Sequence, residues 1–179
     1  DEEGAPEVTL AIRRILLIHG IILTVGGLPL LYLGDEIATL NDYAYRDDPN
    51  KAHDSRWVHR PKADWERYEN RHQPTTSEGR VFHGLQALIQ LRKSHPAFAN
   101  GELEVIDTGN PQVLGFVRTF AGERALVFAN FSEAEQTIPI RVLTQYNGYA
   151  LDQWHGDSQL TSHTALTLSA LDLVVLGRP

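Results

Sequence analysis

The 179-residue chain contains no cysteine and no methionine. Without cysteine it can form no disulfide, no thiolate nucleophile and no zinc site with cysteine ligands, so its composition is compatible with any cellular compartment. Without methionine, Asp1 is not the product of a start codon. We therefore expect that the chain has been cut, processed or renumbered at its amino end.

Clusters of basic residues are also missing. The chain has 16 Lys and Arg residues against 23 Asp and Glu residues, which gives a formal net charge of −7. Neither Lys nor Arg is concentrated in one segment, which argues against a nucleic-acid interface and against an anionic membrane surface as partners. With 42% hydrophobic and 22% charged residues, the composition suits one globular domain or one domain plus part of another.

A continuous membrane span is a third absence. Residues 15–33 carry no Asp, Glu, Lys or Arg, and their number would suffice to cross a bilayer. The stretch is interrupted by His19 and by the helix breakers Gly26, Gly27 and Pro29. The pattern therefore predicts a helix, a turn and a strand instead of a membrane span.

The helix is predicted to begin at Pro6-Glu7, because proline suits the first turn and a carboxylate suits the positive end of the helix dipole. Apolar residues recur at helical spacing and cover nearly all sides of its second half, so we expect neighbouring elements on most sides. These residues are Val8, Ile12, Ile15, Leu16, Ile22 and Leu23.

Residues 28–33 form a short apolar run without alternation, which is typical of a strand buried on both faces in a parallel sheet. Asp35 and Glu36 follow directly, at the strand end where α/β barrels and open α/β sheets place their ligand sites. The alternative is that these carboxylates only cap the turn that follows.

Residues 41–76 are rich in charged and aromatic side chains and poor in aliphatic ones. This composition predicts one long loop, and a long loop in a compact domain is usually functional. The motif Asp54-Ser55-Arg56-Trp57 combines a carboxylate, a guanidinium group and an indole, a mixture that suits the recognition of polyols. The alternative is that such charges pair with one another at the surface.

A second helix is predicted after Thr75-Thr76-Ser77-Glu78, which reads as a capping box in which Thr75 accepts from the amide of Glu78. The helix should end before Pro96. Beyond Pro96 the pattern changes to strand periodicity, and seven short runs predict an antiparallel β-sandwich over residues 97–179. The predicted strands are residues 103–106, 113–120, 125–130, 137–140, 149–151, 165–168 and 171–176.

Motifs for cofactors and metals are missing from the sequence. It has no glycine-rich phosphate loop after a strand, no His-Glu-x-x-His and no Gly-x-Ser-x-Gly, and its eight histidines lack metal-ligand spacing. A cation site from Asp47, Asp48 and Asp54 is not expected, because their spacing matches no known metal-binding loop. We therefore expect neither a cofactor nor a metal.

The run from Gly27 to Glu36, Gly-Leu-Pro-Leu-Leu-Tyr-Leu-Gly-Asp-Glu, resembles the eighth barrel strand of the α-amylase superfamily, glycoside hydrolase family 13. More narrowly, Asn41-Asp42, Asn50-Lys51 and the run from Asp54 to Pro61 resemble the amylosucrases. The resemblance extends over the whole chain. It implies that residues 1–96 are the last part of a (β/α)8 barrel, with its last strand and flanking helices, and that the antiparallel β-sandwich at 97–179 is the domain that follows such barrels.

Amylosucrases transfer glucose from sucrose to an α-1,4-glucan by a retaining double displacement and release fructose. The resemblance places the three catalytic carboxylates on barrel strands upstream of this chain, and a complete barrel needs about 250 residues. It therefore implies as partners the upstream barrel of the same polypeptide, sucrose and an α-glucan acceptor, and it leaves a homodimer open. The chain alone should be inactive. Alternatives are a sucrose hydrolase or phosphorylase, another enzyme of the superfamily, or a non-catalytic carbohydrate-binding β domain.

The resemblance carries one substrate-binding residue over to this chain. Arg56 matches the arginine that pairs with an upstream aspartate and closes the glucosyl pocket, where a bidentate ion pair makes a rigid, charged wall. Asp35, Glu36, Asp54 and Trp57 are expected to support this site. For Trp57, as for Trp65, stacking on a sugar and packing in the protein interior both remain open.

Overall fold

The computed structural model describes residues 5–146, 148–149, 151–156 and 165–178. These residues form two compact units, one made of Asp1–Leu30 and Gly84–Pro179 and the other of Leu31–His83. Each unit is described by itself below. The predicted boundary between residues 96 and 97 stays a prediction.

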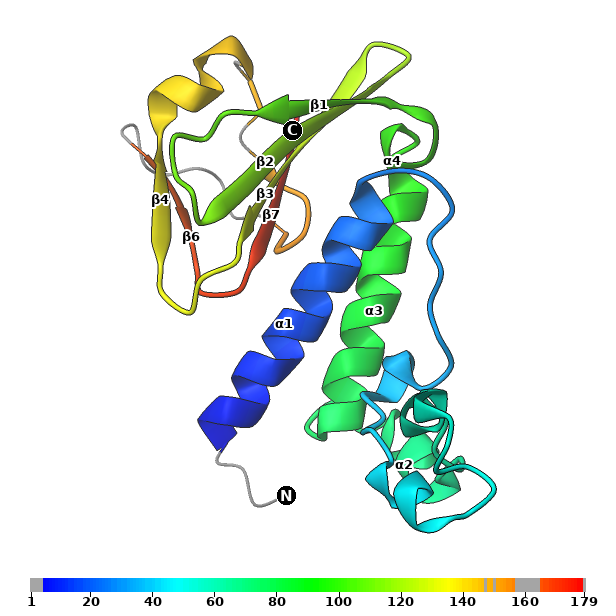
Figure 1. Cartoon of the computed structure of the whole chain (residues 1–179). Helices are drawn as coiled ribbons and strands as arrows, with labels where there is room; N and C mark the ends of the chain where they lie inside the picture. The colour runs from blue at the N-terminus through cyan, green and yellow to red at the C-terminus, as the bar shows by residue number, and fades with distance from the viewer. Residues whose placement is uncertain (1–4, 147, 150, 157–164, 179) are drawn as a thin grey trace. The chain divides into compact units, whose positions relative to one another are not determined.

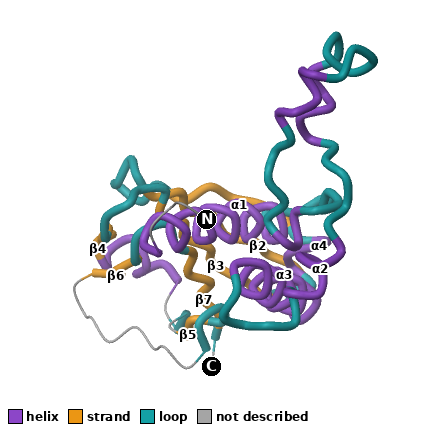
Figure 2. Tube along the Cα trace, turned by 90° about the horizontal axis from the view of Figure 1, so that it is seen from below, coloured by secondary structure: helices purple, strands orange, loops and turns teal. Residues whose placement is uncertain are grey.

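Two helices of the first unit confirm the sequence prediction. Helix α1 (Ala5–Thr24) lies beside the part of α3 (Ser77–Ser94) from Gly84 onward (Figures 1 and 2). The two helices approach closely, because a Cβ at Gly84 would lie 2.6 Å from a methyl carbon of Leu16. A short third helix, α4 (Ala97–Asn100), follows α3 and was not predicted. Among the described residues no helix is both long enough and apolar enough to span a membrane.

Seven strands are present in the described residues, as predicted, and every pairing is antiparallel. One sheet has the order β1-β2-β3-β7-β5 and the other consists of β4 and β6. A 3-10 segment, η4 (Ile140–Tyr146), follows β4. The strands are β1 (Glu102–Ile106), β2 (Val113–Phe120), β3 (Glu123–Asn130), β4 (Gln136–Pro139), β5 (Leu151–Asp152), β6 (Ala165–Leu168) and β7 (Leu173–Gly177). Residue 147 and residue 150, which belongs to the predicted strand at 149–151, lie outside the described residues.

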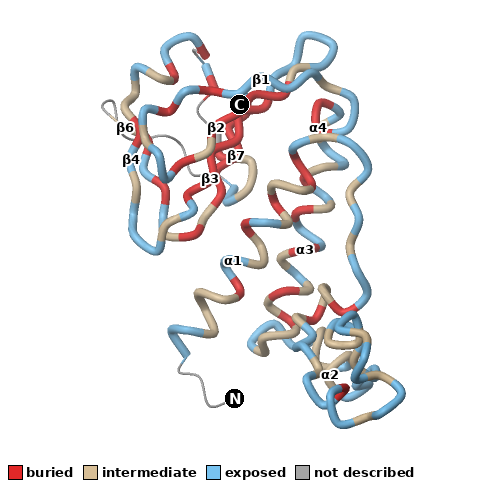
Figure 3. Tube along the Cα trace, viewed as in Figure 1, coloured by how far each residue is buried: buried red, intermediate tan, exposed pale blue. Residues whose placement is uncertain are grey.

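The core of the β domain lies between the two sheets. Phe128 on β3 and Leu176 on β7 are fully buried against Ile138 and Leu168 of the smaller sheet. Because strands alternate their faces, these short apolar runs present one side to this core, which is why the sequence pattern located them. Figure 3 shows buried residues in the strands of this unit and also along α1 and α3.

Residues 28–33 are not a strand in this structure, so the prediction of a strand buried on both faces is wrong here. The side chains point into solvent, with Leu28 99%, Leu30 79% and Leu33 78% exposed. A parallel strand needs neighbouring strands to bind its amide and carbonyl groups and to cover both faces. Among the described residues no strand pairs with this segment, and the barrel expected from the sequence is not seen.

The second unit consists of short helical turns. They are η1 (Asp35–Ile37), η2 (Tyr43–Asp47), η3 (Ser55–His59), α2 (Trp65–Asn70) and the first turns of α3. The prediction of one long loop over residues 41–76 is therefore wrong in part. Aspartates create these turns, because the side chains of Asp42, Asp54 and Asp64 each accept a hydrogen bond from a backbone amide in the first turn.

Candidate functional site

The turn after residue 33 is held by its own two carboxylates. Asp35 Oδ2 accepts from the amide of Tyr32 at 3.0 Å, and Glu36 Oε2 accepts from the amide of Gly34 at 2.7 Å. Gly34 has φ +103°, a conformation that favours glycine. The contacts that the structure gives Asp35 and Glu36 are thus those of turn-stabilising residues, and their supporting role in a sugar site stays a prediction.

Arg56 and Asp54 form a forked ion pair inside η3. Arg56 Nε lies 2.9 Å from Asp54 Oδ1 and Arg56 Nη2 lies 2.8 Å from Asp54 Oδ2, while the amide of Arg56 donates to Oδ1 at 3.0 Å. The Arg56 side chain and then its backbone amide lower the pKa of Asp54 to about 2. Asp54 therefore fixes the guanidinium group in one orientation although 75% of the Arg56 side chain is exposed.

The two tryptophans of this region lie in different surroundings. Trp57 is half-buried, with Lys51 Nζ 5.0 Å and Arg60 Cζ 5.8 Å from its ring centroid, so cations contact the indole. Trp65 is 73% exposed and lies 5.5 Å from the ring of Tyr68. Of the two, Trp65 is the more accessible to a ligand.

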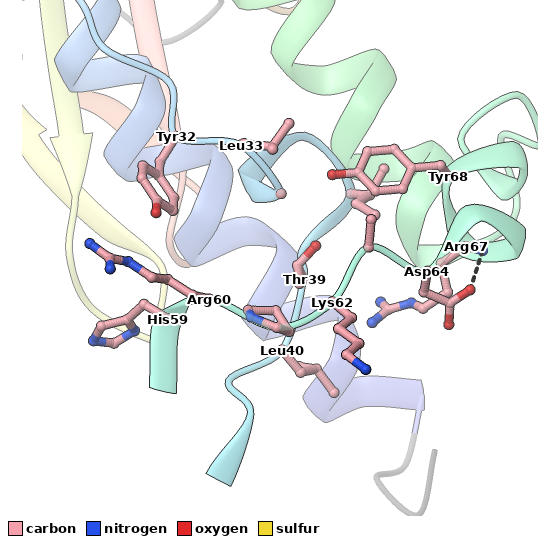
Figure 4. A pocket seen from close by; sticks show the side chains of 14 residues that line it. Tyr32, Leu33, Thr39, Leu40, His59, Arg60, Lys62, Asp64, Arg67 and Tyr68 are labelled. Atoms are coloured by element: carbon pink, nitrogen blue, oxygen red, sulfur yellow. Dashed lines mark hydrogen bonds between the residues drawn. The ribbon is translucent and has the colours of Figure 1, made fainter. Parts of the chain in front are cut away.

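A pocket of about 370 Å³ opens between residues 32–40 and residues 59–68 (Figure 4). Its wall combines apolar side chains with two tyrosines and several cations, the mixed lining that suits small polar ligands. The lining residues are Tyr32, Leu33, Gly34, Ile37, Thr39, Leu40, His59, Arg60, Pro61, Lys62, Ala63, Asp64, Arg67 and Tyr68.

Two basic residues of this pocket, Arg67 and His59, lie within hydrogen-bond distance of neighbouring oxygens. Arg67 Nε lies 2.7 Å from Glu78 Oε1, and the amide of Arg67 donates to Asp64 (Figure 4). His59 Nδ1 lies 3.1 Å from the side-chain oxygen of Asn41. Burial, and secondly the charge of Glu36, raises the pKa of Tyr68, so its hydroxyl keeps its proton at neutral pH.

Sequence reasoning did not find this pocket. The signal that could have indicated it is the density of cationic side chains from His59 to Arg67. The pocket lining includes neither Arg56 nor Trp57, so the structure does not bring the predicted substrate-binding residue into it. Within the described part of the chain, no group of three or more His, Cys, Asp or Glu side chains could hold a metal ion.

Comparison with known proteins identifies the β domain. Residues 103–172 match the family model described as the C-terminal domain of maltogenic amylase. The trehalose-6-phosphate hydrolase of Bacillus subtilis is 32% identical over 87 residues, which are 48% of this chain and 14% of that protein. The trehalose synthase/amylase TreS of Mycobacterium tuberculosis is 27% identical over an alignment of 167 residues that covers 76% of this chain and 26% of that protein.

A solved structure agrees with these matches at the level of the fold. The trehalulose synthase MutB from Pseudomonas mesoacidophila, solved as a variant in complex with its substrate sucrose, superimposes with a TM-score of 0.64 at 18% identity. The match covers 91% of this chain and 38% of MutB. The chain therefore spans between 14% and 38% of the length of these three proteins.

Residues 103–172 are thus similar to the C-terminal domain of maltogenic amylase. Parts of the chain are similar in sequence to a trehalose-6-phosphate hydrolase and to a trehalose synthase/amylase. The narrower resemblance to the amylosucrases bears on the proposed function.

Proposed function

We propose that this chain is the carboxyl-terminal part of a sucrose-utilising glucosyltransferase of the α-amylase superfamily. One observation carries the proposal: the Asp54-Ser55-Arg56-Trp57 motif folds into a turn that presents a guanidinium group held by two bonds to a carboxylate. A fixed guanidinium group can close a sugar pocket without losing side-chain freedom at the moment of binding.

The remainder of the polypeptide would supply the catalytic carboxylates. In a retaining mechanism one carboxylate attacks the anomeric carbon, and a carboxylic acid protonates the departing fructose oxygen. A glucan hydroxyl then takes the glucosyl group from the enzyme. Arg56 would bind the far end of the glucosyl ring, and Asp54 would hold its orientation.

The exposed apolar residues 28–33 support the proposal that an upstream barrel covers this chain. Leu28, Leu30 and Leu33 each leave more than three quarters of their surface in solvent. Leucines exposed in succession are unusual on the surface of a monomeric protein and indicate that another part of the molecule covers them. Parallel strands of the same polypeptide would cover both faces of such a segment.

A second candidate is an enzyme that hydrolyses α-glucosides. The relationship to the trehalose-6-phosphate hydrolase of Bacillus subtilis favours this candidate. The two candidates share the covalent intermediate and differ in whether a sugar hydroxyl or water accepts the glucosyl group. Product analysis therefore distinguishes them.

The test uses the intact polypeptide that carries this chain. With sucrose and a glucan primer we expect fructose to be released and the glucan to lengthen; glucose and fructose in equal amounts without glucan would instead indicate a hydrolase. No fructose release at all would exclude both sucrose-based activities. The 179-residue chain by itself should release none.

Arg56→Ala examines the site directly. We expect it to lower kcat/KM for sucrose at least about 100-fold, because the proposed guanidinium contact with the glucosyl ring is lost. Arg46→Ala is the matched control, since Arg46 is also exposed in the second unit, where it lies over the rings of Tyr43 and Tyr45 and forms a hydrogen bond with Tyr45. Equal kinetics for wild type and Arg56→Ala would remove Arg56 from the site.

A further inference from the structure

A buried arginine lies on a strand of the β domain, at a position where a strand residue with so little exposed surface is usually apolar. Arg118 is on β2, directly after Phe116 and Val117, and only 5% of it is exposed. A buried charge is costly unless hydrogen bonds replace the water that it loses. The partners of Arg118 therefore indicate why the strand contains it.

The guanidinium group of Arg118 binds three backbone carbonyl groups. Nε donates to Ala97 at 3.1 Å, Nη1 donates to Val25 at 2.9 Å, and Nη2 donates to Gly101. Val25 follows α1, whereas Ala97 and Gly101 begin and follow α4. One side chain of the sheet thus joins the ends of two helices.

Arg92, on α3, binds the same region from the other side. Its Nη1 donates to the carbonyl of Leu23 at 2.6 Å and to that of Phe98 at 2.9 Å, and its Nη2 donates to Gly27 at 2.7 Å. Burial, and secondly the charge of Arg92, lowers the pKa of Arg118. The two cations are thus close enough to repel each other, and the carbonyl dipoles that each of them binds offset that repulsion.

Three of the six carbonyl groups that the two arginines bind, those of Leu23, Val25 and Gly27, lie in or just after the last turn of α1. The last carbonyls of a helix have no partner within the helix, and they form the negative end of its dipole. The last turn of α1 contains no basic residue of its own. Arg92 and Arg118, 65 or more positions away, supply the missing donors.

The chain at this point has little freedom to move away. Gly26 has φ +115° and Gly27 has φ +69°, both in the region that favours glycine. A Cβ at Gly26 would lie 2.9 Å from Arg118 Nη2, so the guanidinium group occupies the space beside the glycine. Residues 23–27 are therefore held from both sides immediately before the exposed apolar segment 28–33.

We propose that Arg92 and Arg118 are positioning residues that hold the backbone of residues 23–27 and thereby fix where the segment 28–33 begins in the assembled active site. The proposal rests on the proposed function for its kinetic consequence. It gives the β domain and α3 a direct part in fixing the start of this segment. Neither arginine needs to contact substrate.

The variants for the test are Arg92→Met, Arg92→Lys and Arg118→Lys in the intact polypeptide. Arg92 is only half-buried, so Arg92→Met should fold even if substitution of Arg118 does not. Lysine keeps the charge but cannot bind carbonyls in several directions from one planar group. Arg124→Met is the matched control, because Arg124 lies on the neighbouring strand β3 and is exposed.

Two measurements decide the outcome. By hydrogen–deuterium exchange we expect residues 28–39 to exchange about tenfold faster in the Arg92 variants, with residues 113–130 unchanged, because only the anchor of the segment is lost. Well below the unfolding temperature, kcat for sucrose should fall about tenfold with KM within twofold. Arg92→Lys should recover part of both losses, and Arg124→Met should resemble wild type.

Several results would overturn the proposal. Faster exchange in all segments alike would reduce the arginines to general stability elements, and unchanged exchange at 28–39 would show that they hold nothing there. Faster exchange at residues 28–39 alone, with an unchanged kcat, would show that the two arginines hold the segment but do not position it for catalysis. If the wild-type polypeptide does not use sucrose, the proposed function fails, and the exchange measurement still decides whether the two arginines hold the segment.

Discussion

The β domain and the second unit are stabilised in different ways. In the β domain, Leu126, Phe128 and Leu176 are completely buried between two sheets, and their amides belong to continuous ladders. In the second unit Ile37 and Val81 are buried, but Tyr32, Leu33 and Leu40 are exposed, and short turns depend on aspartate caps. Figure 3 shows this contrast as mostly exposed and intermediate residues around α2.

The contrast indicates that the two regions owe their stability to different interactions. A region with its own apolar core keeps its structure without help, whereas a region held by caps and surface ion pairs gains little from each of them. The exposed apolar residues of the second unit are consistent with the proposal that an upstream barrel completes it. The same lack of a large core leaves loops accessible, as ligand sites require.

The largest effect is expected in the core of the β domain. Phe128→Ala removes a side chain with no exposed surface and should lower the free energy of unfolding by about 3–5 kcal/mol, measured by chemical denaturation. Phe131→Ala is the control; Phe131 is 45% exposed, and its loss should cost less than about 1 kcal/mol. If both variants lost a similar amount of unfolding free energy, the stabilising core would not be the interface between the two sheets.

Helix capping gives the next effect, in the second unit. Thr76 Oγ1 accepts from the amide of Gly79 at 3.0 Å, and helix α3 begins at Ser77, so Thr76 is the cap. Thr76→Ala should cost about 1 kcal/mol in a denaturation experiment, while Thr75→Ala should cost only a few tenths. A larger loss of unfolding free energy for Thr75→Ala than for Thr76→Ala would show that Thr75 is the cap, as predicted from the sequence.

A histidine makes the stability of the β domain depend on pH. His155 Nδ1 lies 2.5 Å from Asp152 and Nε2 lies 3.2 Å from Asp172, and hydrogen bonds to Asp152 and then Asp172 raise the pKa of His155 to about 10. Because the pKa is higher in the folded state, this stabilisation is fully present below pH 6.5 and is lost as the pH rises toward 10.

Melting curves between pH 6 and 10 measure this contribution. Since the side chain is 36% exposed, solvent screening reduces the effect, and we expect the wild type to lose about 2–4 °C more than His155→Gln over this interval. His53→Gln, at an exposed position of the second unit, is the control and should follow the wild-type curve. Parallel curves for wild type and His155→Gln would show that the two carboxylates do not hold a proton on His155.

The smallest effect concerns the Asp54–Arg56 pair in the exposed turn. An NMR titration should give Asp54 a pKa of about 2, and Arg56→Ala should raise it toward the ordinary value of 3.8. Because the folded-state pKa is depressed, the pair stabilises the turn above that ordinary value and loses this effect as the pH falls toward 2. Arg46→Ala should leave the titration unchanged, and an Asp54 pKa near 3.8 in wild type would show that the fork does not persist in solution.

Local patterns in the sequence predicted most of the regular structure. The apolar spacing from Val8 to Leu23 corresponds to α1, and the strand-like runs correspond to the seven strands within one or two residues. These predictions succeed because the chain buries one face of each element against its own residues. The capping box was misplaced by one position, because two adjacent threonines offer equivalent hydroxyl groups and only the helix start distinguishes them.

Patterns that depend on distant partners could not be interpreted from the sequence. The apolar run at 28–33 looks like a buried strand because its composition shows that burial would be favourable. Composition does not show whether neighbouring strands are present to bury it. The pocket between residues 32–40 and 59–68 was missed because its lining comes from two separated segments of turns. The substrate role of Arg56 and the supporting roles of Asp35, Glu36, Asp54 and Trp57 remain predictions.

The sequence by itself determined where helices and strands form and that Asp54, Arg56 and Trp57 share one short motif, because these features depend on residues a few positions apart. Only the tertiary structure decided that the charges of Arg92 and Arg118 converge on the carbonyl end of α1. The physical reason is distance along the chain: donors and acceptors that are 65 to 93 positions apart meet only when the sheet and the helices have packed.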